Sequence, residues 1–281
     1  MTYFGFLGVF LITPIILLII VAAADARRGR LLPETLRSWP IWVIILAHAM
    51  IALIYTTPWD NYLVATRVWW YQPELVTGVL IGYVPIEEYT FFVLQPILTG
   101  LWLMFLARHL PINDHNIRRG VRVRRVATLV IGALWLGAAV MLSAGWQPGT
   151  YLGLLLVWAL PPVMLQLAFG ADILWRHRRL VFLSIVPMTL YLSAADKLAI
   201  TSGTWTINPE QSLNIFLLGR LPLEEFLFFF MTNTLITLGV TLFTAAESQA
   251  RARRWAQAAG RVLKRRGVQS AAVPSEKLAG N

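Results

Sequence analysis

The sequence contains no cysteine and little charge. None of its 281 residues is Cys, and charged residues make up 14% of the chain, against about 25% in typical soluble domains. The missing cysteine excludes disulfides, thiolate metal sites, iron–sulfur clusters and cysteine nucleophiles. The four histidines match no zinc spacing, so we expect no metal site; they are His48, His109, His115 and His177. The low charge argues against a disordered chain and against a soluble globular enzyme.

Long apolar runs take the place of charge. Hydrophobic residues make up 57% of the chain, and a helix that spans a bilayer needs about 20 mostly apolar residues. Seven stretches meet this requirement, at about 2–24, 40–57, 86–107, 126–145, 151–171, 180–195 and 223–245. The sequence therefore predicts an all-α bundle of seven transmembrane helices.

Basic residues are distributed unevenly between the two sides that seven spans create. The side of the N-terminus holds only Arg67, Lys197 and Arg220, and the other side holds the remaining 21 of the 24 Lys and Arg residues. Because cytoplasmic loops carry the excess of Lys and Arg, we expect a multi-pass protein of the cell membrane, with its N-terminus outside and its C-terminus in the cytoplasm. This distribution explains the net charge of +10 without a nucleic-acid partner.

The two ends of the chain lead to separate expectations. The first ten residues carry no positive charge, whereas a cleaved signal peptide normally begins with one, so we expect the first helix to be a retained span. The tail at 247–281 is basic, and we expect it to rest on anionic membrane lipids or to lie in water.

The sequence also repeats itself. Thr2–Pro14 recurs as Thr150–Pro162, and VPIEEYTFF from Val84 recurs as LPLEEFLFF from Leu221. Between these segments Asp60, Trp69, Pro73 and Glu74 recur as Asp196, Trp205, Pro209 and Glu210. Copies that lie four spans apart point the same way, so the pattern predicts a parallel 3+1+3 internal repeat. We expect a first repeat at 1–110, a linking helix within 111–149, a second repeat at 150–246 and the basic tail at 247–281.

Eight of the 14 acidic residues belong to these repeated motifs. They are Asp60, Glu74, Glu87, Glu88, Asp196, Glu210, Glu224 and Glu225. The apolar stretches around the two Glu pairs are too long for one span, so we expect a short interfacial or re-entrant segment before Pro85 or Pro222 and a full helix after it. Acidic residues beside hydrocarbon are costly and usually functional.

The adjacent carboxyl groups suggest acid–base chemistry. Proline followed by two acids is also a common start of a helix, but two such pairs with flanking acids contain more carboxylate than capping requires. Because neighbouring carboxyl groups in a poorly hydrated site do not both ionise easily, we expect an acid beside a carboxylate. Aromatic faces stabilise cations, and the aromatic residues nearest the motifs include Trp69, Trp205, Phe91, Phe92, Phe228 and Phe229. Together these features favour protonation of an alkene and a carbocation intermediate.

The duplicated Pro–x–Glu–Glu–x–x–Phe–Phe motif resembles that of the small integral-membrane lycopene cyclases, which occur as two-subunit enzymes in some bacteria and as fused chains in archaea and fungi. The motifs here are Pro85–Phe92 and Pro222–Phe229, and the resemblance includes PWDN at Pro58–Asn61 and covers about residues 1–246. It implies a redox-neutral isomerisation that converts linear ψ end groups of lycopene to β rings, giving γ-carotene and then β-carotene.

The resemblance also implies which groups take part. Glu87, Glu88, Glu224 and Glu225 would be catalytic, and the other repeated acids and the six aromatic residues named above would contact the substrate or stabilise the cation. The substrate would be a hydrophobic carotenoid from the bilayer, with membrane lipids as surroundings and other carotenoid enzymes as candidate partners. We expect no cofactor, because no G-x-G-x-x-G fingerprint or other cofactor signature occurs.

The two halves differ near their Glu pairs, since Asn61 is replaced by Lys197 and Tyr83 by Arg220. A nearby cation favours the ionised carboxylate. We therefore predict that Glu87 and Glu88 donate protons, whereas Glu224 and Glu225 are more often ionised and act as base or cation stabiliser.

Other functions stay open at this stage. Parallel 3+1+3 repeats also build sugar carriers, so a proton-coupled small-molecule transporter is the main alternative, and transport in vesicles would decide. A structural scaffold is a further alternative. The sequence leaves open whether the substrate has 40 or 50 carbon atoms, which ring forms, whether one or both ends react, and the oligomeric state.

Overall fold

The computed structural model describes residues 1–111 and 120–271, so His115 and residues 272–281 of the basic tail lie outside the described part. Seven helical stretches within the described ranges are long and apolar enough to cross a membrane, which confirms the expected number of spans. They are Tyr3–Arg27, Glu34–Ala65, Ile86–His109, Gly120–Ser143, Gln147–Arg176, Arg178–Thr201 and Leu223–Thr244.

The first stretch is α1 (Tyr3–Leu7), a π-helical turn (Gly8–Ile12) and α2 (Thr13–Arg27) in one rod. The other long helices are α3 (Ile41–Ala65), α4 (Ile86–His109), α5 (Gly120–Ser143), α6 (Thr150–Arg176), α7 (Arg178–Thr201), α8 (Leu223–Thr244) and α9 (Ala246–Ala271). The short strands are β1 (Trp69–Tyr71), β2 (Leu80–Ile81), β3 (Val84–Pro85), β4 (Trp205–Ile207), β5 (Phe216–Leu217) and β6 (Leu221–Pro222). The remaining 3-10 turns are Glu34–Leu36, Pro73–Leu75, Gln147–Gly149 and Pro209–Gln211.

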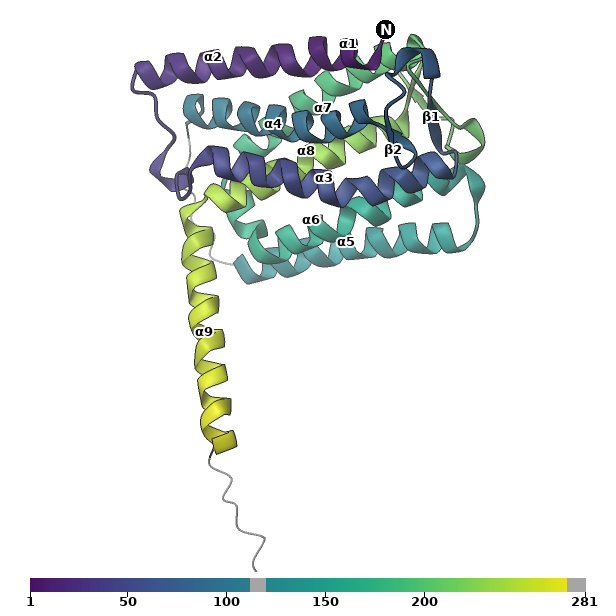
Figure 1. Ribbon diagram of the computed structural model, residues 1–281. Coiled ribbons are helices and arrows are strands. Elements are labelled where there is room, and N and C mark those ends of the chain that lie inside the picture. The colour runs from purple at the N-terminus through teal and green to yellow at the C-terminus, as the bar shows by residue number, and fades with distance from the viewer. Residues whose placement is uncertain (112–119, 272–281) are drawn as a thin grey trace, which may run out of the picture.

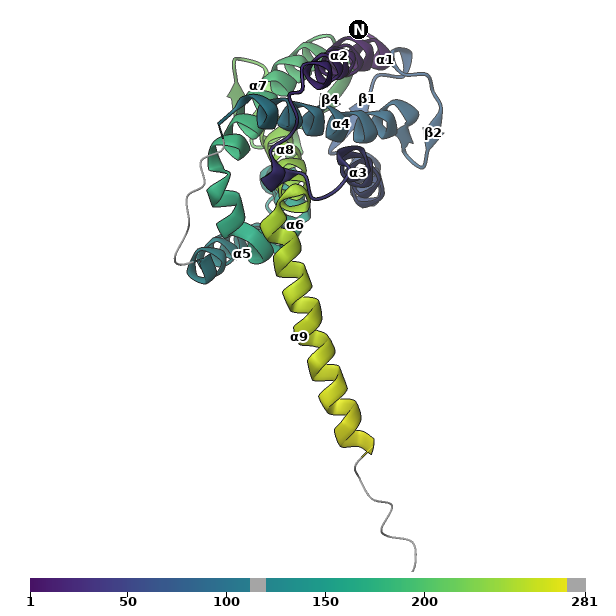
Figure 2. The same cartoon turned by 90° about the vertical axis from the view of Figure 1, so that its left-hand side faces the viewer.

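The long helices other than α9 run side by side, with α4 and α8 at the centre (Figures 1 and 2). These two carry the duplicated Glu pairs and are the most buried of the seven stretches, whereas α5 has few buried residues and packs against α6. An apolar surface exposed to this degree is what a lipid-facing helix requires. The centre of the bundle is therefore formed by the two helices that carry the acidic motifs.

Two helices are longer than the sequence predicts. We expected spans at 40–57 and 180–195, whereas α3 continues to Ala65 and α7 to Thr201. Pro58 is accommodated within α3, and each extension places a buried aspartate, Asp60 or Asp196, in the last turns of its helix. The two aspartates consequently lie inside the bundle rather than in the loops that follow it.

The segments before Pro85 and Pro222, for which we expect short interfacial or re-entrant segments, form β-hairpins. Strand β2 pairs with β3, and β5 pairs with β6. Helices α4 and α8 then begin directly after the two prolines, with both Glu pairs in their first turns, as the sequence predicts. Proline suits this position because it cannot donate an N–H to a preceding turn, and acids there complement the helix dipole.

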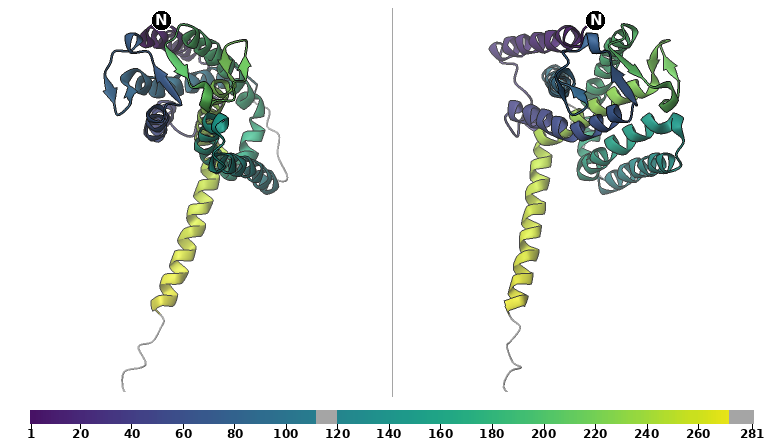
Figure 3. Two further views of the ribbon diagram at one scale, coloured as in Figure 1. Left: turned by 90° about the vertical axis from the view of Figure 1, so that its right-hand side faces the viewer. Right: turned by 45° about the vertical axis from the view of Figure 1, so that its right-hand side comes forward.

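The two ends of the bundle differ in character. The N-terminus and all the strands lie at one end, and α9 leaves the opposite end across the direction of the other helices (Figures 1 and 3). At that second end Arg108 binds the buried Asp25, with 3.2 Å between nitrogen and oxygen. Arg251 of α9 forms a two-pronged bond to Asp172 of α6, at 2.6 and 2.8 Å. These ion pairs attach α2 to α4 and fix the start of α9.

The first hairpin is attached to α3 through Asn61. The Asn61 side-chain oxygen accepts the Tyr83 N–H at 2.8 Å, and its amide donates to the Tyr89 hydroxyl at 2.8 Å. Gly82 has a φ of +67° in the turn, and a Cβ added there would collide with the Asn61 side chain. Gly78 has a φ of +77° but has open space around it.

We predict that Gly82→Ala lowers the melting temperature in detergent clearly more than Gly78→Ala does. Both substitutions place a Cβ at positive φ, which costs about 1–2 kcal/mol, but only the first also displaces Asn61. Thermal unfolding of both purified variants measures the difference. Equal losses would contradict the role assigned to Asn61.

Candidate active site

A pairing of strands from the two halves covers the end of the bundle. Strand β1 follows α3, strand β4 follows α7, and the two pair antiparallel, with Trp69 opposite Ile207 and Tyr71 opposite Trp205. Because of this pairing, each tryptophan packs against a residue of the other half of the chain. The Trp205 ring lies 5.0 Å from the Tyr3 ring, and the Trp69 ring lies 5.1 Å from the Tyr151 ring.

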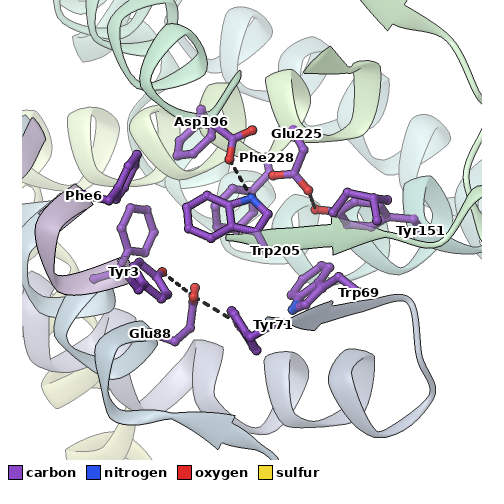
Figure 4. A pocket seen from close by; sticks show the side chains of 13 residues that line it. Tyr3, Phe6, Trp69, Tyr71, Glu88, Tyr151, Asp196, Trp205, Glu225 and Phe228 are labelled. Carbon is purple, nitrogen blue, oxygen red and sulfur yellow. Dashed lines mark hydrogen bonds between the residues drawn. The ribbon is translucent and has the colours of Figure 1, made fainter. Parts of the chain in front are cut away.

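A cavity of about 450 Å³ lies beneath this strand pair. Both halves contribute to its wall (Figure 4), which consists of Tyr3, Phe6, Trp69, Tyr71, Glu88, Phe91, Tyr151, Asp196, Trp205, Ile207, Glu225, Phe228 and Phe229. Three of these residues are acidic and the others are aromatic or aliphatic. Among the residues that the structure describes, no Lys, Arg or His lines the cavity. The wall therefore offers carboxyl groups and ring faces to whatever the cavity holds.

One glutamate of each pair faces the cavity and is held by tyrosine hydroxyls. Glu88 accepts hydrogen bonds from the hydroxyls of Tyr3 and Tyr71, the latter at 3.0 Å. Glu225 accepts one from the hydroxyl of Tyr151 at 2.7 Å. Figure 4 shows both arrangements around the ring of Trp205. Each carboxyl group is fixed in position, as a group that exchanges protons with a bound substrate must be.

The other glutamate of each pair turns away and binds backbone. Glu87 accepts the Thr77 N–H at 2.7 Å, and Glu224 accepts the Leu213 N–H at 2.6 Å. Both side chains are fully buried, yet neither lines the cavity. The adjacent acids thus have different partners. Glu87 and Glu224 bind the preceding loops to α4 and α8, whereas the carboxyl groups of Glu88 and Glu225 are available to a substrate in the cavity.

The two aspartates lie close to the cavity glutamates. Asp196 lines the cavity and accepts a hydrogen bond from the Trp205 indole N–H at 3.0 Å. Asp60 is buried, interacts electrostatically with Glu88 and Glu225, and has no hydrogen-bond partner for either oxygen among the described residues. A buried carboxylate without a partner is costly. Burial therefore favours protonated carboxyl groups in this cluster and disfavours several carboxylates at the same time.

The aromatic candidates divide between two cavities. Trp69, Trp205, Phe91, Phe228 and Phe229 all line the acid cavity. Phe92 packs against Phe91, with 6.3 Å between ring centroids, and lines a neighbouring cavity instead. Five of the six predicted aromatic residues are thus brought together.

Two predicted acids do not join the site. Glu74 and Glu210 are exposed, in the 3-10 turns before the hairpins. Glu74 accepts a hydrogen bond from the Gln72 side chain, and the backbone of Glu210 binds the Asn208 side chain. Both glutamates lie in the turn that recurs, and the structure does not bring either of them to the acid cavity.

The predicted difference between the halves also needs correction. Arg220 is exposed and Lys197 only partly buried, and within the described residues neither forms an ion pair with Glu224 or Glu225. The replacement of Asn61 and Tyr83 by cations therefore gives no reason to assign the acid to the first half.

Three hydroxyl donors were missed as site residues. Tyr3 and Tyr151 are recurring residues at the start of the two repeats, and this recurrence was the signal that could have identified them. Tyr71 has no such signal, because Ile207 lies at the corresponding position. Burial, together with the negative charge of Asp60 and Glu88, raises the pKa of the Tyr71 hydroxyl well above its usual value, so Tyr71 stays a donor.

A rigid cavity lined by carboxyl groups and ring faces, inside a bundle of membrane-spanning helices, defines the site of an acid–base enzyme for an apolar substrate. The lycopene cyclase family model matches residues 1–106 and 148–244. The chain therefore belongs to the lycopene cyclase family and is an enzyme that catalyses cyclisation, an intramolecular reaction of the isomerase type.

Individual relatives agree with this membership. A lycopene beta-cyclase of Halobacterium salinarum is 39% identical over 244 residues, which cover 86% of this chain and 95% of that protein. A bifunctional lycopene cyclase/phytoene synthase of Aspergillus niger is 38% identical over 198 residues, covering 68% of this chain and 33% of that protein. A protein of the same name from Sporisorium reilianum is 38% identical over 195 residues, covering 66% and 28%. No solved structure matches the chain.

We predict that Glu87→Ala lowers the melting temperature while Glu87→Gln largely retains it. Alanine leaves the Thr77 N–H without its charged acceptor, which costs about 1.5–3 kcal/mol, whereas the glutamine oxygen can still accept. Thermal unfolding in detergent measures both, with Glu74→Ala as the control for losing an exposed acid. If Glu87→Gln unfolded as early as Glu87→Ala, the negative charge of Glu87 rather than its acceptor role would be what matters.

Proposed function

We propose that the chain is a lycopene β-cyclase that converts the linear ψ end groups of lycopene to β rings, giving γ-carotene and then β-carotene. One observation carries the proposal: Glu88 and Glu225, from opposite halves, face a single cavity lined by aromatic rings. The name of the Halobacterium salinarum relative supports the choice of lycopene and of the β ring.

The cyclisation balances without any oxidant or reductant. A carboxyl group gives its proton to C2 of the end group, which leaves a cation at C1. The C5=C6 double bond attacks C1, so that the C1–C6 bond forms and the charge moves to C5. A carboxylate removes the proton from C6, and the C5=C6 double bond forms again. The ring faces of Trp69, Trp205 and Phe228 lie around the cavity and stabilise the passing cation.

We assign Glu225 as the acid and Glu88 as the base. Two hydroxyl groups, those of Tyr3 and Tyr71, donate to Glu88, and one, that of Tyr151, donates to Glu225. Because donors stabilise a carboxylate, Glu88 is better suited to hold negative charge. This assignment reverses the one drawn from Lys197 and Arg220.

We further propose that the two halves, 1–110 and 150–246, are parallel copies joined by a linking segment at 111–149 that contains α5. The contacts support this arrangement because they recur in pairs. Tyr3–Glu88 corresponds to Tyr151–Glu225, and Thr77–Glu87 corresponds to Leu213–Glu224. The acid cavity lies where the copies meet.

In the membrane, we propose that the end with the strands faces outward and the end with α9 faces the cytoplasm. The excess of Lys and Arg at the α9 end supports this orientation. Because α9 runs across the direction of the spanning helices (Figure 1), it would extend along the membrane surface, where its basic residues meet anionic lipid. The substrate would come from the surrounding bilayer.

We predict that bacteria engineered to accumulate lycopene form β-carotene when they express this chain. Glu88→Gln and Glu225→Gln, which keep the shape but cannot exchange the proton, should each reduce cyclised pigment by about 100-fold or more. Glu74→Gln and Glu210→Gln should leave it near the wild-type amount, because these acids lie outside the cavity. Chromatography and absorption spectra of the pigments give the measurement, at matched protein levels in the membrane.

Two outcomes would overturn the proposal. Unchanged lycopene with abundant wild-type protein would remove lycopene as the substrate. Full activity in both Glu88→Gln and Glu225→Gln would remove the cavity as the site of chemistry.

A further inference from the structure

A second cavity, of about 750 Å³, lies between α3, α4, α6 and α8. Its wall is largely apolar and consists of His48, Ile51, Ala52, Tyr55, Thr56, Phe91, Phe92, Gln95, Trp158, Pro162, Gln166, Phe228, Thr232, Leu235 and Ile236. Ile51 and Tyr55 on its rim are 57% and 41% exposed. It therefore opens sideways, toward the face of the bundle that lipid surrounds, and is called the lateral groove below.

The lateral groove adjoins the acid cavity. Phe91 and Phe228 line both, and their rings are 6.4 Å apart between centroids. On α3 the groove extends from His48 to Thr56, which at 1.5 Å per residue is about 12 Å along the spanning direction. A molecule with its end in the acid cavity and its body in the groove would thus lie alongside α3.

The interior of the groove suits an apolar, flat ligand. Its outer wall is aromatic, because the Trp158 ring stacks on the ring of Tyr55 with 5.8 Å between centroids. Several of its polar side chains bind protein groups: His48 is bonded to the Ile44 carbonyl, Gln95 to Asn233, and the amide of Gln166 to the Leu235 carbonyl. Trp158 Nε1 and Gln166 Oε1 are buried without a hydrogen-bond partner among the described residues. The wall as a whole is nevertheless largely apolar.

The corresponding position in the other half carries larger side chains. The Tyr55 hydroxyl donates to the Trp158 carbonyl at 2.8 Å, and the Tyr191 hydroxyl donates to the Phe10 carbonyl at 3.0 Å. Tyr55 and Tyr191 therefore occupy equivalent positions in the two halves, as Asp60 and Asp196 do, and these equivalences align the sequence of α3 with that of α7.

In that alignment Ala52 and Thr56 of the groove correspond to Met188 and Leu192, which are 6% and 0% exposed. Larger side chains thus pack into the core where the first half has small ones. The small residues of α3 are what leave the groove open.

We propose that the lateral groove binds the linear polyene arm of the carotenoid while its end group lies in the acid cavity, and that the substrate passes between α3 and α6 from the bilayer. This inference rests on the proposed cyclase function. It also gives an order of events: because the lateral groove and the acid cavity together hold one arm and one end group, the two ends of a substrate react in separate binding events, and the monocyclic product leaves before it binds in the reverse direction.

The test fills the groove with the residues of the other half. Ala52→Met/Thr56→Leu should reduce cyclised pigment at least about tenfold in lycopene-accumulating bacteria, because the larger side chains occupy the space of the polyene arm and exclude it from the groove. Ile54→Met is the matched control, since Ile54 lies on the same helix and is 68% exposed on the lipid side. We expect the control to retain wild-type conversion.

A second measurement separates binding from folding and from chemistry. The inactive Glu88→Gln/Glu225→Gln protein should copurify with lycopene, and adding Ala52→Met/Thr56→Leu should remove most of that pigment while the melting temperature is retained. Adding Ile54→Met should not. If the filled groove retained the full lycopene load, or displaced copurified phospholipid and no pigment, the groove would hold an acyl chain rather than substrate and the inference would be wrong. Failure of wild-type protein to cyclise lycopene would instead overturn the proposed function.

Discussion

The structure depends on the burial of four carboxyl groups, those of Asp60, Glu88, Asp196 and Glu225, at the place where two halves of an apolar bundle meet. Within the part of the chain that the structure describes, no cation lines the cavity that Glu88, Asp196 and Glu225 share, and an apolar interior penalises every unpaired charge. The surrounding architecture satisfies these acids in other ways. Tyrosine hydroxyls bind the two glutamates, an indole N–H binds Asp196, and the pairing of β1 with β4 brings each tryptophan to the other half. The carboxyl oxygens that lack a hydrogen-bond partner remain available for proton transfer.

Much of this could be predicted from the sequence because it follows from local physics. Runs of about 20 apolar residues identify spans whatever their packing, and the proline–Glu–Glu motif marks the first turn of a helix wherever it occurs. Recurrence of the motifs pointed to three acids and five aromatic residues that the structure brings together around the acid cavity. The family followed from the same residues, and the matches at 1–106 and 148–244 confirm it.

The parts that the sequence could not provide all depend on long-range contacts. Recurrence does not distinguish Glu88, which faces the cavity, from Glu87, which binds the Thr77 N–H. It does not show that Glu74 is exposed, because a repeated turn looks like a repeated site. The exchange of Trp69 and Trp205 between halves arises from strand pairing across 136 positions of sequence, and no local pattern predicts it.

In the proposed mechanism, buried carboxyl groups add one proton to the substrate and remove another, with no change in oxidation state. Mass spectrometry of the pigment that purified protein forms from lycopene in deuterium oxide tests this mechanism. We expect a gain of about one mass unit per ring, because a carboxyl deuteron is delivered to C2 and a proton leaves C6. Rings that form without deuterium, or with a loss of hydrogen, would contradict it.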